Sequence, residues 1–483
     1  MKKMICLVAI LGLLFASNVC PAGFGGIWKS TPGNVNFWIS EHDTGSMTVV
    51  VTPDARTYQS YLDSDFSDGF NAGELGGDGS TLSITFSSDT QAKADLTPSG
   101  GDPVSYALTK DFGGVFCGLV FSSGGIFSDP NGLAYRATAS SPYGAVKYTT
   151  SSGSDLVLFN DSFVRAHNGN VYVVGRFNSD SVTVLDAVHT QGNPLANYSV
   201  GKTDPGGNFE IPSPQASTNP QDLEFISDSV AYMSFLGSPA ILKLNPLTGQ
   251  RLGLIDISGF TQGVDGLPEA NQMVRVGEFL YVILQQLDQQ NAFEPLQGLV
   301  IKIHTLSDTV MDLNPLAEGM QGIALQRKNP GNMVYLEDTK ELFVQCVGSY
   351  SDAEVKSGIE VIDTTTDTSK GLRVTEEAAG LQIANIALCN AAKGYLLGYD
   401  VSFNSIISEF NPTSGEMVQN GLFQANYFIE DIKTGCLSCG CTLFTTDRSD
   451  ADPGIIAIDT KTNAIAGKGA TDLPMHFLSI LER

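Results

Sequence analysis

The sequence predicts an all-β protein: a small N-terminal antiparallel β-barrel or sandwich followed by a β-propeller. Two observations predict this fold class. In the C-terminal two thirds, six stretches share one pattern, in which an aromatic-centred strand, a polar loop, an alternating strand and an Asp- or Asn-led turn follow one another. Ahead of them, short alternating runs are bounded by Gly- and Pro-rich turns, which is typical of small antiparallel sheets.

The six repeats keep one register. A period of roughly 40–50 residues, stretched by loop insertions, is typical of a four-stranded propeller blade. Six such turns favour six blades; seven is the alternative, if Leu156–Phe159 and His476–Leu481 pair to form a further blade. The turns open at Asp186, Asn245, His304, Asp363, Asn411 and Asp459. The central aromatics of the strands before them are Tyr172, Tyr232, Tyr281, Phe343, Tyr395 and Phe444.

The residue types in these turns have a physical reason. Asp or Asn in first position can accept a hydrogen bond from the backbone N–H two residues on, and Pro can preset φ at the next position. Near the end of the turn, Gly249, Gly415, Asp308, Asp367 or Asn463 can take the left-handed conformation that closes it. We therefore expect these turn residues to be structural.

One repeat carries a family resemblance. The stretch NVYVVGRFNSDSVTVLDAVHT, residues 170–190, resembles the YVTN-type (YncE-like) propeller repeat of bacterial envelope and secreted proteins. The resemblance covers about 155–483, but the tetrapeptide here is Tyr172-Val173-Val174-Gly175 and only this first repeat is close. It implies a ring-shaped β-propeller and little about function, because the fold hosts binding proteins, scaffolds and enzymes alike.

The charge and the N-terminus indicate an exported protein. The chain holds 27 Lys and Arg against 52 Asp and Glu, a net charge of −25, which excludes nucleic acid and anionic membrane surfaces as expected partners. Residues 1–22 read as a Sec signal peptide, with Lys2 and Lys3 ahead of the apolar run Ile5–Phe15, which is too short for a transmembrane helix. No transmembrane segment is expected elsewhere, so we expect a periplasmic, extracellular or cell-surface location.

The composition divides the rest of the chain into three parts. Residues 23–112 are expected to form the small β domain, because six or more alternating runs lie between turn clusters. Residues 113–154 are rich in Gly, Ser and Pro and are expected to be a linker. Residues 155–483 are expected to form the propeller.

Cysteines suggest disulfides, with other chemistries left open. Three of them crowd into CLSCGC, at the hairpin between the first two strands of the last repeat, and Cys389 occupies the matching hairpin of the repeat before it. In an exported protein such a set reads first as disulfides, with Cys389 as a cross-blade partner. A Cys-rich zinc or iron–sulfur site and a redox-active Cys-x-x-Cys are the alternatives. The disulfide candidates are Cys117, Cys346, Cys389, Cys436, Cys439 and Cys441.

The predicted ligand surface rests on geometry. In a propeller, the loops after the second strand of each blade share one face with the loops between blades, and binding residues often lie on loops held by such a scaffold. Arg176 and Arg448 occupy equivalent loop positions in the first and last repeats, which become neighbours when a ring closes. They could pair an anion, or be neutralised by Asp180, Asp447 and Asp450. The predicted mouth residues are Arg176, Asp265, Gln285, Asp288, Tyr350, Tyr399, Asp400, Asp447 and Arg448.

No standard catalytic motif accompanies these residues. The five histidines form no His-x-x-x-His or His-Glu-x-x-His pattern, and Gly-x-Ser-x-Gly and a Walker loop are absent. The sequence therefore favours a binding or scaffold module for a polar small molecule, a glycan or an envelope protein, with no cofactor. One alternative is a metal-dependent propeller lactonase or hydrolase, with Ca²⁺ or a similar ion held by acids such as Asp265 and Asp288. A second is a redox or metal-handling protein acting through CLSCGC.

Overall fold

The computed structural model describes most of the chain beyond residue 25. The predicted signal peptide lies outside the described residues. No helix among the described residues has the length and apolar character needed to cross a membrane. The described ranges are 26–31, 36–42, 46–52, 56–61, 70–73, 80–86, 91–110, 119–126, 129–138, 144–187, 189–349, 351–437, 440–449 and 451–481.

The chain divides into two compact units, and the second begins at Leu119. The first unit contains one antiparallel sheet of eight strands, in the order β4-β3-β2-β1-β8-β7-β6-β5. Its two end strands, β4 and β5, lie in contact. This sheet lies within residues 23–112, where the sequence predicts a small antiparallel domain. Its strands are β1 Gly26–Thr31, β2 Asn36–His42, β3 Ser46–Thr52, β4 Arg56–Tyr61, β5 Phe70–Gly73, β6 Thr81–Phe86, β7 Gln91–Thr97 and β8 Val104–Lys110.

The second unit repeats one small antiparallel sheet along the chain. Each of the six predicted repeats forms a sheet in which the second strand carries the central aromatic. The first three sheets are β13 Ser162–His167, β14 Asn170–Gly175, β15 Ser181–Asp186, β16 Ala196–Ser199; β17 Pro220–Ser227, β18 Val230–Phe235, β19 Ala240–Leu244, β20 Arg251–Asp256; and β21 Ala270–Val276, β22 Phe279–Leu284, β25 Leu299–His304, β26 Thr309–Val310, with β27 Ile323–Ala324 on β25.

The next three sheets follow the same plan, and two short additions complete this part of the chain. The hairpin β23 Leu287–Asp288 and β24 Glu294–Pro295 is inserted between β22 and β25, and the single described α-helix is α1 Glu376–Ala379. The three sheets are β28 Pro330–Leu336, β29 Glu341–Cys346, β30 Gly358–Asp363, β31 Thr368–Thr375; β32 Gln382–Asn390, β33 Lys393–Tyr399, β34 Ser405–Phe410, β35 Met417–Ala425; and β36 Ile432–Leu437, β37 Gly440–Asp447, β38 Gly454–Asp459, β39 Ala464–Ala470.

A seventh sheet of this kind occupies the expected linker. Within residues 113–154 lie β9 Leu119–Gly125, β10 Asn131–Thr138 and β11 Gly144–Lys147, which pair in the order β11-β10-β9-β40. The small residues that suggested a linker are there for packing. A Cβ on Gly124 would lie 2.4 Å from the Pro474 carbonyl oxygen, and Ser122 and Ser123 are completely buried. Gly and Ser here allow a close approach between strands, rather than marking a break in the sheet.

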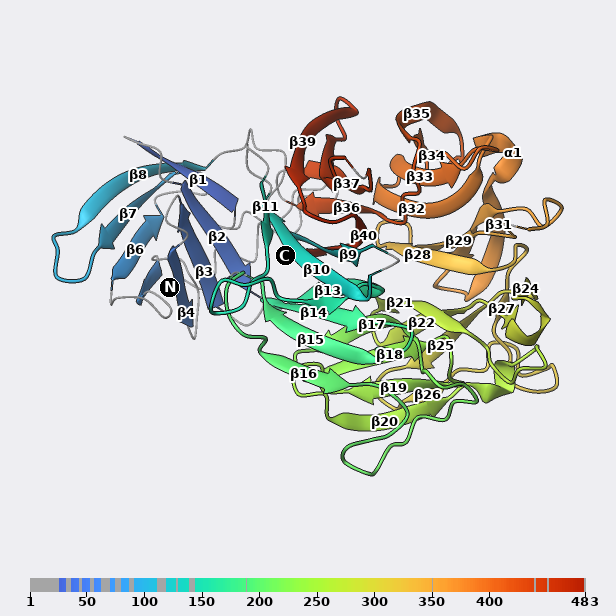
Figure 1. Cartoon of the computed structure of the whole chain (residues 1–483). Helices are drawn as coiled ribbons and strands as arrows, with labels where there is room; N and C mark the ends of the chain where they lie inside the picture. Colours follow the sequence, from blue (N-terminus) through green and yellow to red (C-terminus); the bar gives the residue numbers. More distant parts are fainter. Residues whose placement is uncertain are drawn as a thin grey trace, which may run out of the picture. The chain divides into compact units, whose positions relative to one another are not determined.

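The strand that completes this sheet comes from the C-terminus. β40, Met475–Leu481, pairs with β9 from Met475 opposite Gly124 to Leu481 opposite Leu119. The expected pairing of Leu156–Phe159 with 476–481 is wrong: β12, Leu158–Phe159, pairs instead with β10. In Figure 1 the first strands of the sheets lie toward the middle of this unit, around β40 and β9, and later strands lie farther out.

The hydrophobic core lies between consecutive sheets. Tyr172 packs with residues of both the β13–β16 and the β17–β20 sheet, and Tyr232 and Tyr281 occupy the following two interfaces. All six predicted central aromatics are at most 2 % exposed. Tyr232 and Tyr281 also donate their hydroxyls to turns farther along the chain, where Asp308 and Asp367 accept. These central tyrosines thus connect neighbouring sheets both by apolar packing and by hydrogen bonds of their hydroxyl groups.

The turns are built as the sequence predicts. Asn245 accepts from the Leu247 backbone N–H at 3.0 Å, and Asn411 accepts from that of Thr413 at 2.9 Å. The closing residues have positive φ, including Asp308 at 54° and Gly249 at 73°. Asp308 and Asp367 also accept hydrogen bonds from buried tyrosines and from lysines of other strands. The polar residues of the repeat therefore stabilise the fold together with its apolar residues.

Candidate binding site

A closed circuit of hydrogen bonds joins the innermost strands of all seven sheets. Each strand presents a polar residue that reaches the next strand around the ring, and the last link returns to the first. The links are Arg165 Nε to Asp222 Oδ1, Met273 N to Asp222 Oδ2, Met333 N to Gln272 Oε1, Asn332 Nδ2 to Asn385 Oδ1, Asn385 Nδ2 to Asp431 Oδ1, Leu478 N to Asp431 Oδ2, and Ala166 N to Ser479 Oγ.

Bulges place several of these polar residues on the circuit. The register of the first strand shifts between Pro220 and Asp222 in β17, between Pro330 and Asn332 in β28, and between Ile383 and Asn385 in β32. A bulge turns a strand locally and re-aims a side chain. The next residue along each strand is apolar and buried, so the polar side chain faces the axis of the ring and the apolar one faces the core.

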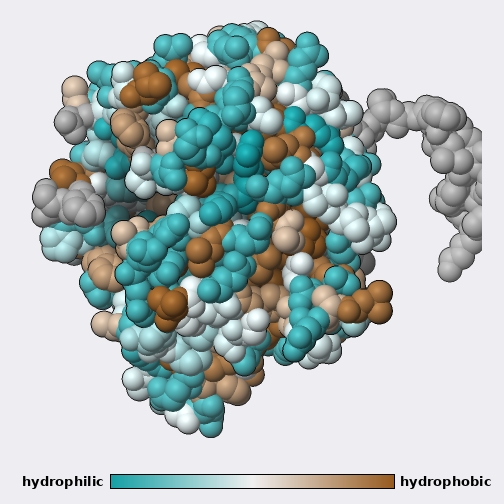
Figure 2. Space-filling view, turned by 90° about the vertical axis from the view of Figure 1, so that its right-hand side faces the viewer, coloured by the Kyte–Doolittle hydropathy of each residue, from teal (hydrophilic) through white to brown (hydrophobic). Residues whose placement is uncertain are grey.

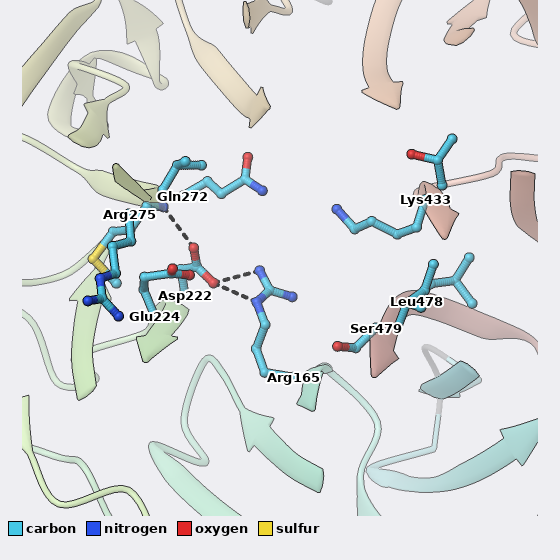
Figure 3. Close-up of a pocket in the computed structure, with 12 residues that line it drawn as sticks. Arg165, Asp222, Glu224, Gln272, Arg275, Lys433, Leu478 and Ser479 are labelled. Atoms are coloured by element: carbon cyan, nitrogen blue, oxygen red, sulfur yellow. Dashed lines mark hydrogen bonds and ion pairs between the residues drawn. The ribbon is translucent and has the colours of Figure 1, made fainter. Parts of the chain in front are cut away.

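Five of the innermost strands, β13, β17, β21, β36 and β40, line an axial cavity of about 310 Å³. Figure 3 shows that Arg165, Gln272 and Lys433 point toward the middle of this cavity from three sides. Arg275 and Glu224 lie together on one wall, beside Asp222. The cavity is lined by Arg165, Asp222, Glu224, Gln272, Met273, Val274, Arg275, Lys433, Thr434, Leu478, Ser479 and Ile480.

Both oxygens of the Asp222 carboxylate accept hydrogen bonds from groups in the cavity wall. Its Oδ1 accepts from Arg165 Nε at 2.8 Å and from the Leu223 backbone N–H at 2.8 Å. Its Oδ2 accepts from the Met273 backbone N–H at 2.7 Å, and the side chain is 1 % exposed. A buried carboxylate with this many donors is a fixed part of the structure.

Glu224 differs from Asp222, because it lacks a cationic partner at ion-pair distance among the described residues. Burial raises the pKa of Glu224 to about 8, and the neighbouring charge of Asp222 adds to this shift. The charges of Arg165 and Arg275 act in the opposite direction without cancelling it. Glu224 is therefore neutral at pH 7 and can donate a hydrogen bond from its carboxyl group.

Arg176 and Arg448 meet one charged cluster, as their positions in the first and last repeats suggested. Arg448 Nη1 donates to Glu430 Oε1 at 2.7 Å, and His476 Nδ1 lies 3.0 Å from Glu430 Oε2. Arg176 Nε donates to Asp161 Oδ1 at 2.7 Å, and the guanidinium stacks on Phe477. Burial opposes ionisation of Glu430, but the hydrogen bond from His476 and the charges of His476, Arg448 and Arg176 outweigh it and lower its pKa to about 2.

The acids expected to neutralise these arginines are occupied elsewhere. Asp180 accepts from Ser217 Oγ at 2.7 Å and from the Asn219 backbone N–H at 3.0 Å. Asp447 pairs with Lys468 at 2.8 Å. Asp450 lies outside the described residues. Acidic side chains of the protein thus do neutralise Arg176 and Arg448, but these acids are Asp161 and Glu430.

Other predicted mouth residues are hydrogen-bonded to further groups of the protein. Gln285 accepts from Asn271 Nδ2 and donates to Asn329 Oδ1, both at 2.8 Å. Tyr399 donates its hydroxyl to the Ile429 carbonyl at 2.7 Å. Asp400 accepts from the Ser402 and Asn404 backbone N–H groups, so it shapes the β33–β34 turn. Tyr350 lies outside the described part of the chain.

Of the two acids of the metal alternative, Asp288 lies in β23 of the inserted hairpin and Asp265 lies in the loop before β21, in contact with that hairpin. Asp265 accepts from the Leu267 and Gln289 backbone N–H groups at 3.0 and 2.8 Å. Asp288 is 9 % exposed, and its Oδ1 has no hydrogen-bond partner among the described residues. Within the described ranges, no group of three or more His, Cys, Asp and Glu side chains is placed to hold a metal ion.

The cysteines give one cross-sheet disulfide. Cys389 of β32 is joined to Cys441 of β37, as the cross-blade expectation required. This pairing rules out a metal site that uses both Cys389 and Cys441 as thiolates. Cys346, a predicted disulfide candidate, is instead a free and buried thiol of β29. Cys117 and the side chains of Cys436 and Cys439 lie outside what the structure describes.

The sequence reasoning missed the cavity residues. It followed the central aromatics, the turns and the loops, and did not single out the polar residues of the first strand of each repeat. The recurring pair of a polar and an apolar residue was available as a signal. It appears as Asp222-Leu223, Gln272-Met273, Asn332-Met333, Asn385-Ile386 and Asp431-Ile432.

Solved structures of similar fold place this architecture among propeller-like proteins. Two of them are each described as a "putative 6-phosphogluconolactonase", from Bacteroides fragilis (TM-score 0.50, 13 % identity, covering 76 % of this chain and 98 % of that one) and Bacteroides uniformis (0.51, 13 %, 75 % and 99 %). A protein from Lactobacillus plantarum gives 0.52 at 10 % identity, covering 76 % and 99 %. At these identities the similarity shows the fold alone. Neither a protein-family model nor a curated protein sequence matches the chain.

Proposed function

We propose that this protein is an exported binding module, a seven-bladed propeller that holds a small polar ligand in its axial cavity. The observation that carries the proposal is the closed circuit of hydrogen bonds around a cavity of about 310 Å³. A cavity of this size falls at the lower end of ligand pockets, roughly 300–1,000 Å³. Because the circuit fixes the surrounding strands, a ligand would enter a preformed site at low entropic cost.

The location outside the cytoplasm rests on two features. The Cys389–Cys441 disulfide suits an oxidising compartment, and the N-terminal residues read as a signal peptide. On the face drawn in Figure 2, hydrophobic residues are scattered among hydrophilic ones, and Arg176 and Arg448 are already paired within the protein.

The test is native mass spectrometry of the full chain purified from its own source, with a cavity-filling variant beside it. We expect a small molecule to be retained by the wild type and lost from Lys433→Trp, because an indole would fill the space that the Lys433 ammonium faces. Lys340→Trp is the control, since Lys340 is an exposed residue paired with Glu337. If Lys433→Trp folds and still retains the same mass, the ligand lies elsewhere and the proposal fails.

A further inference from the structure

The hydrogen-bonding groups that remain available in the axial cavity are mostly donors. Lys433 Nζ is 3.4 Å from Asp431 Oδ1 and has no shorter polar contact among the described residues. The Gln272 side chain accepts from the Met333 backbone N–H through Oε1, and its amide N–H groups donate to no group of the residues that the structure describes. Arg165 uses Nε and Nη2 on Asp222 and Nη1 on the Val164 carbonyl, and its planar fork keeps further N–H bonds.

Most acceptors in the same space are already used; the exception is the Glu224 carboxyl on one wall, which accepts only a backbone hydrogen bond from Arg275 among the described residues. Both oxygens of Asp222 hold donors of the wall, as described above. Asp431 is equally occupied, with Oδ1 accepting from Asn385 Nδ2 at 3.1 Å and Oδ2 from the Leu478 backbone N–H at 2.9 Å. A cation or a donor-rich ligand would therefore find few oxygen atoms to bind, whereas an acceptor-rich ligand would find several donors.

The geometry points to an oxyanion: we propose that the axial cavity binds a small molecule through a carboxylate or phosphate group, held between Lys433, Arg165 and the Gln272 amide. This inference rests on the proposed binding function and names the chemistry of its ligand. Lys433 comes from β36, Arg165 from β13 and Gln272 from β21, so the donors converge from three sheets (Figure 3). Only a closed ring can bring these strands to one point.

The electrostatics of the cavity agree with this assignment. The chain carries a net charge of −25, yet the cavity wall has the three cations Arg165, Arg275 and Lys433 against Asp222 and Glu224, with Asp431 3.4 Å from Lys433 Nζ. Glu224 is neutral at pH 7, so it adds no repulsion there. A cationic cavity inside an acidic protein attracts an anion to the cavity in preference to the rest of the protein.

The test uses the full chain and isothermal titration at constant ionic strength. The probes are succinate and inorganic phosphate, which separate a carboxylate from a phosphate preference, and succinamide as the uncharged isostere of succinate. We expect saturable binding of at least one oxyanion and none of succinamide. Lys433→Met should weaken the binding by about tenfold to a hundredfold, the loss typical of a charge-assisted hydrogen bond.

Two further variants make the result specific. Gln272→Glu keeps an oxygen for the Met333 N–H but replaces the donor amide by a carboxylate, so it should abolish anion binding while the circuit stays closed. Lys340→Met removes an exposed positive charge and should change nothing. If succinamide binds as well as succinate, or if both cavity variants bind normally, the oxyanion assignment is wrong and the binding function stands. If neither oxyanion binds, the assignment is wrong too; the retained mass of native protein then decides whether any ligand is bound.

Discussion

At the scale of single residues, the protein buries some charged side chains, which in most proteins are exposed. Arg251 is an example, because its side chain is 1 % exposed. Its Nη1 donates to the Phe209 carbonyl at 2.8 Å and its Nη2 to the Thr203 carbonyl at 3.0 Å. The buried guanidinium thus holds together several carbonyl oxygens of the 201–209 loop.

Removing this guanidinium should be costly. We expect Arg251→Ala to lower the free energy of unfolding by about 3–5 kcal/mol, because it removes the donor to the carbonyls of Gly201, Thr203 and Phe209 and the cation 3.7 Å from Asp204. The measurement is denaturant unfolding of the second unit, with the exposed Lys461→Ala as the control, for which a change within about 0.5 kcal/mol is expected. Added guanidinium at low millimolar concentration should recover part of the loss. An unfolding midpoint equal to that of the wild type would contradict this role.

Glu224 predicts a pH dependence of stability. Its pKa is raised in the folded state from 4.5 to about 8, so the unfolded chain loses this proton at lower pH than the folded protein. Stability therefore falls as pH rises from about 4.5 to 8, by linkage. We expect Glu224→Gln to raise Tm at pH 7.5 and to leave it nearly unchanged at pH 4.5. Exposed Glu278→Gln is the control, and a Glu224→Gln gain that is equal at both pH values would refute the assignment.

At the scale of elements, the repeat holds its neighbours by side-chain ties as well as by packing. Lys302 pairs with Asp367 at 2.7 Å, and Lys243 pairs with Asp308 at 2.8 Å. Each of these lysines lies on the third strand of its sheet, and each acid closes a turn farther along the chain. The Cys389–Cys441 disulfide is the covalent version of such a tie, between β32 and β37.

The disulfide should contribute measurably to stability. It joins residues 52 apart, and the loop-closure entropy of such a loop corresponds to about 4 kcal/mol. We expect the double variant Cys389→Ser, Cys441→Ser to unfold at lower denaturant concentration than the oxidised wild type. Its unfolding midpoint should no longer shift when reductant is added. A wild type whose midpoint is unaffected by reduction would show that the tie adds nothing.

At the scale of the whole molecule, closure depends on one strand. β40 contributes Ser479 and Leu478 to the circuit and completes the sheet begun by β9. The apolar residues of β40 also reach two core clusters: Leu481 packs against the one shared with the β13–β16 sheet, and Phe477 against the one between the β13–β16 and β17–β20 sheets. A ring without this strand would expose the edge of β9 and open the axial cavity.

A chain that ends at Pro474 tests this dependence. We expect it to lose the cooperative unfolding of the second unit and to show rapid hydrogen exchange in β9 and β13, since an unpaired edge and an open interface are left. A chain ending at Leu481 is the control and should unfold like the full chain. If the shorter chain keeps one sharp calorimetric transition and slow exchange in β9, closure by β40 is not what stabilises the ring.

Much of the fold could be predicted from the sequence, because the repeat is local. The central aromatics such as Tyr232, the turn residues such as Asn245 and Asp308, and the pairing of Cys389 with the CLSCGC segment all follow from patterns within or between neighbouring repeats. Each of these features depends on chemistry that acts over a few residues, which the sequence displays directly.

The seventh sheet and the cavity were decided by tertiary structure. Gly124 and Ser123 resemble linker residues until the C-terminal strand is placed against them, more than three hundred residues away in sequence. Likewise, Arg165, Gln272 and Lys433 are unremarkable polar residues in three separate strands. Ring closure brings their donors to one axis and excludes water from Asp222. Because that closure is a long-range event, its consequences for charge and binding appear only in three dimensions.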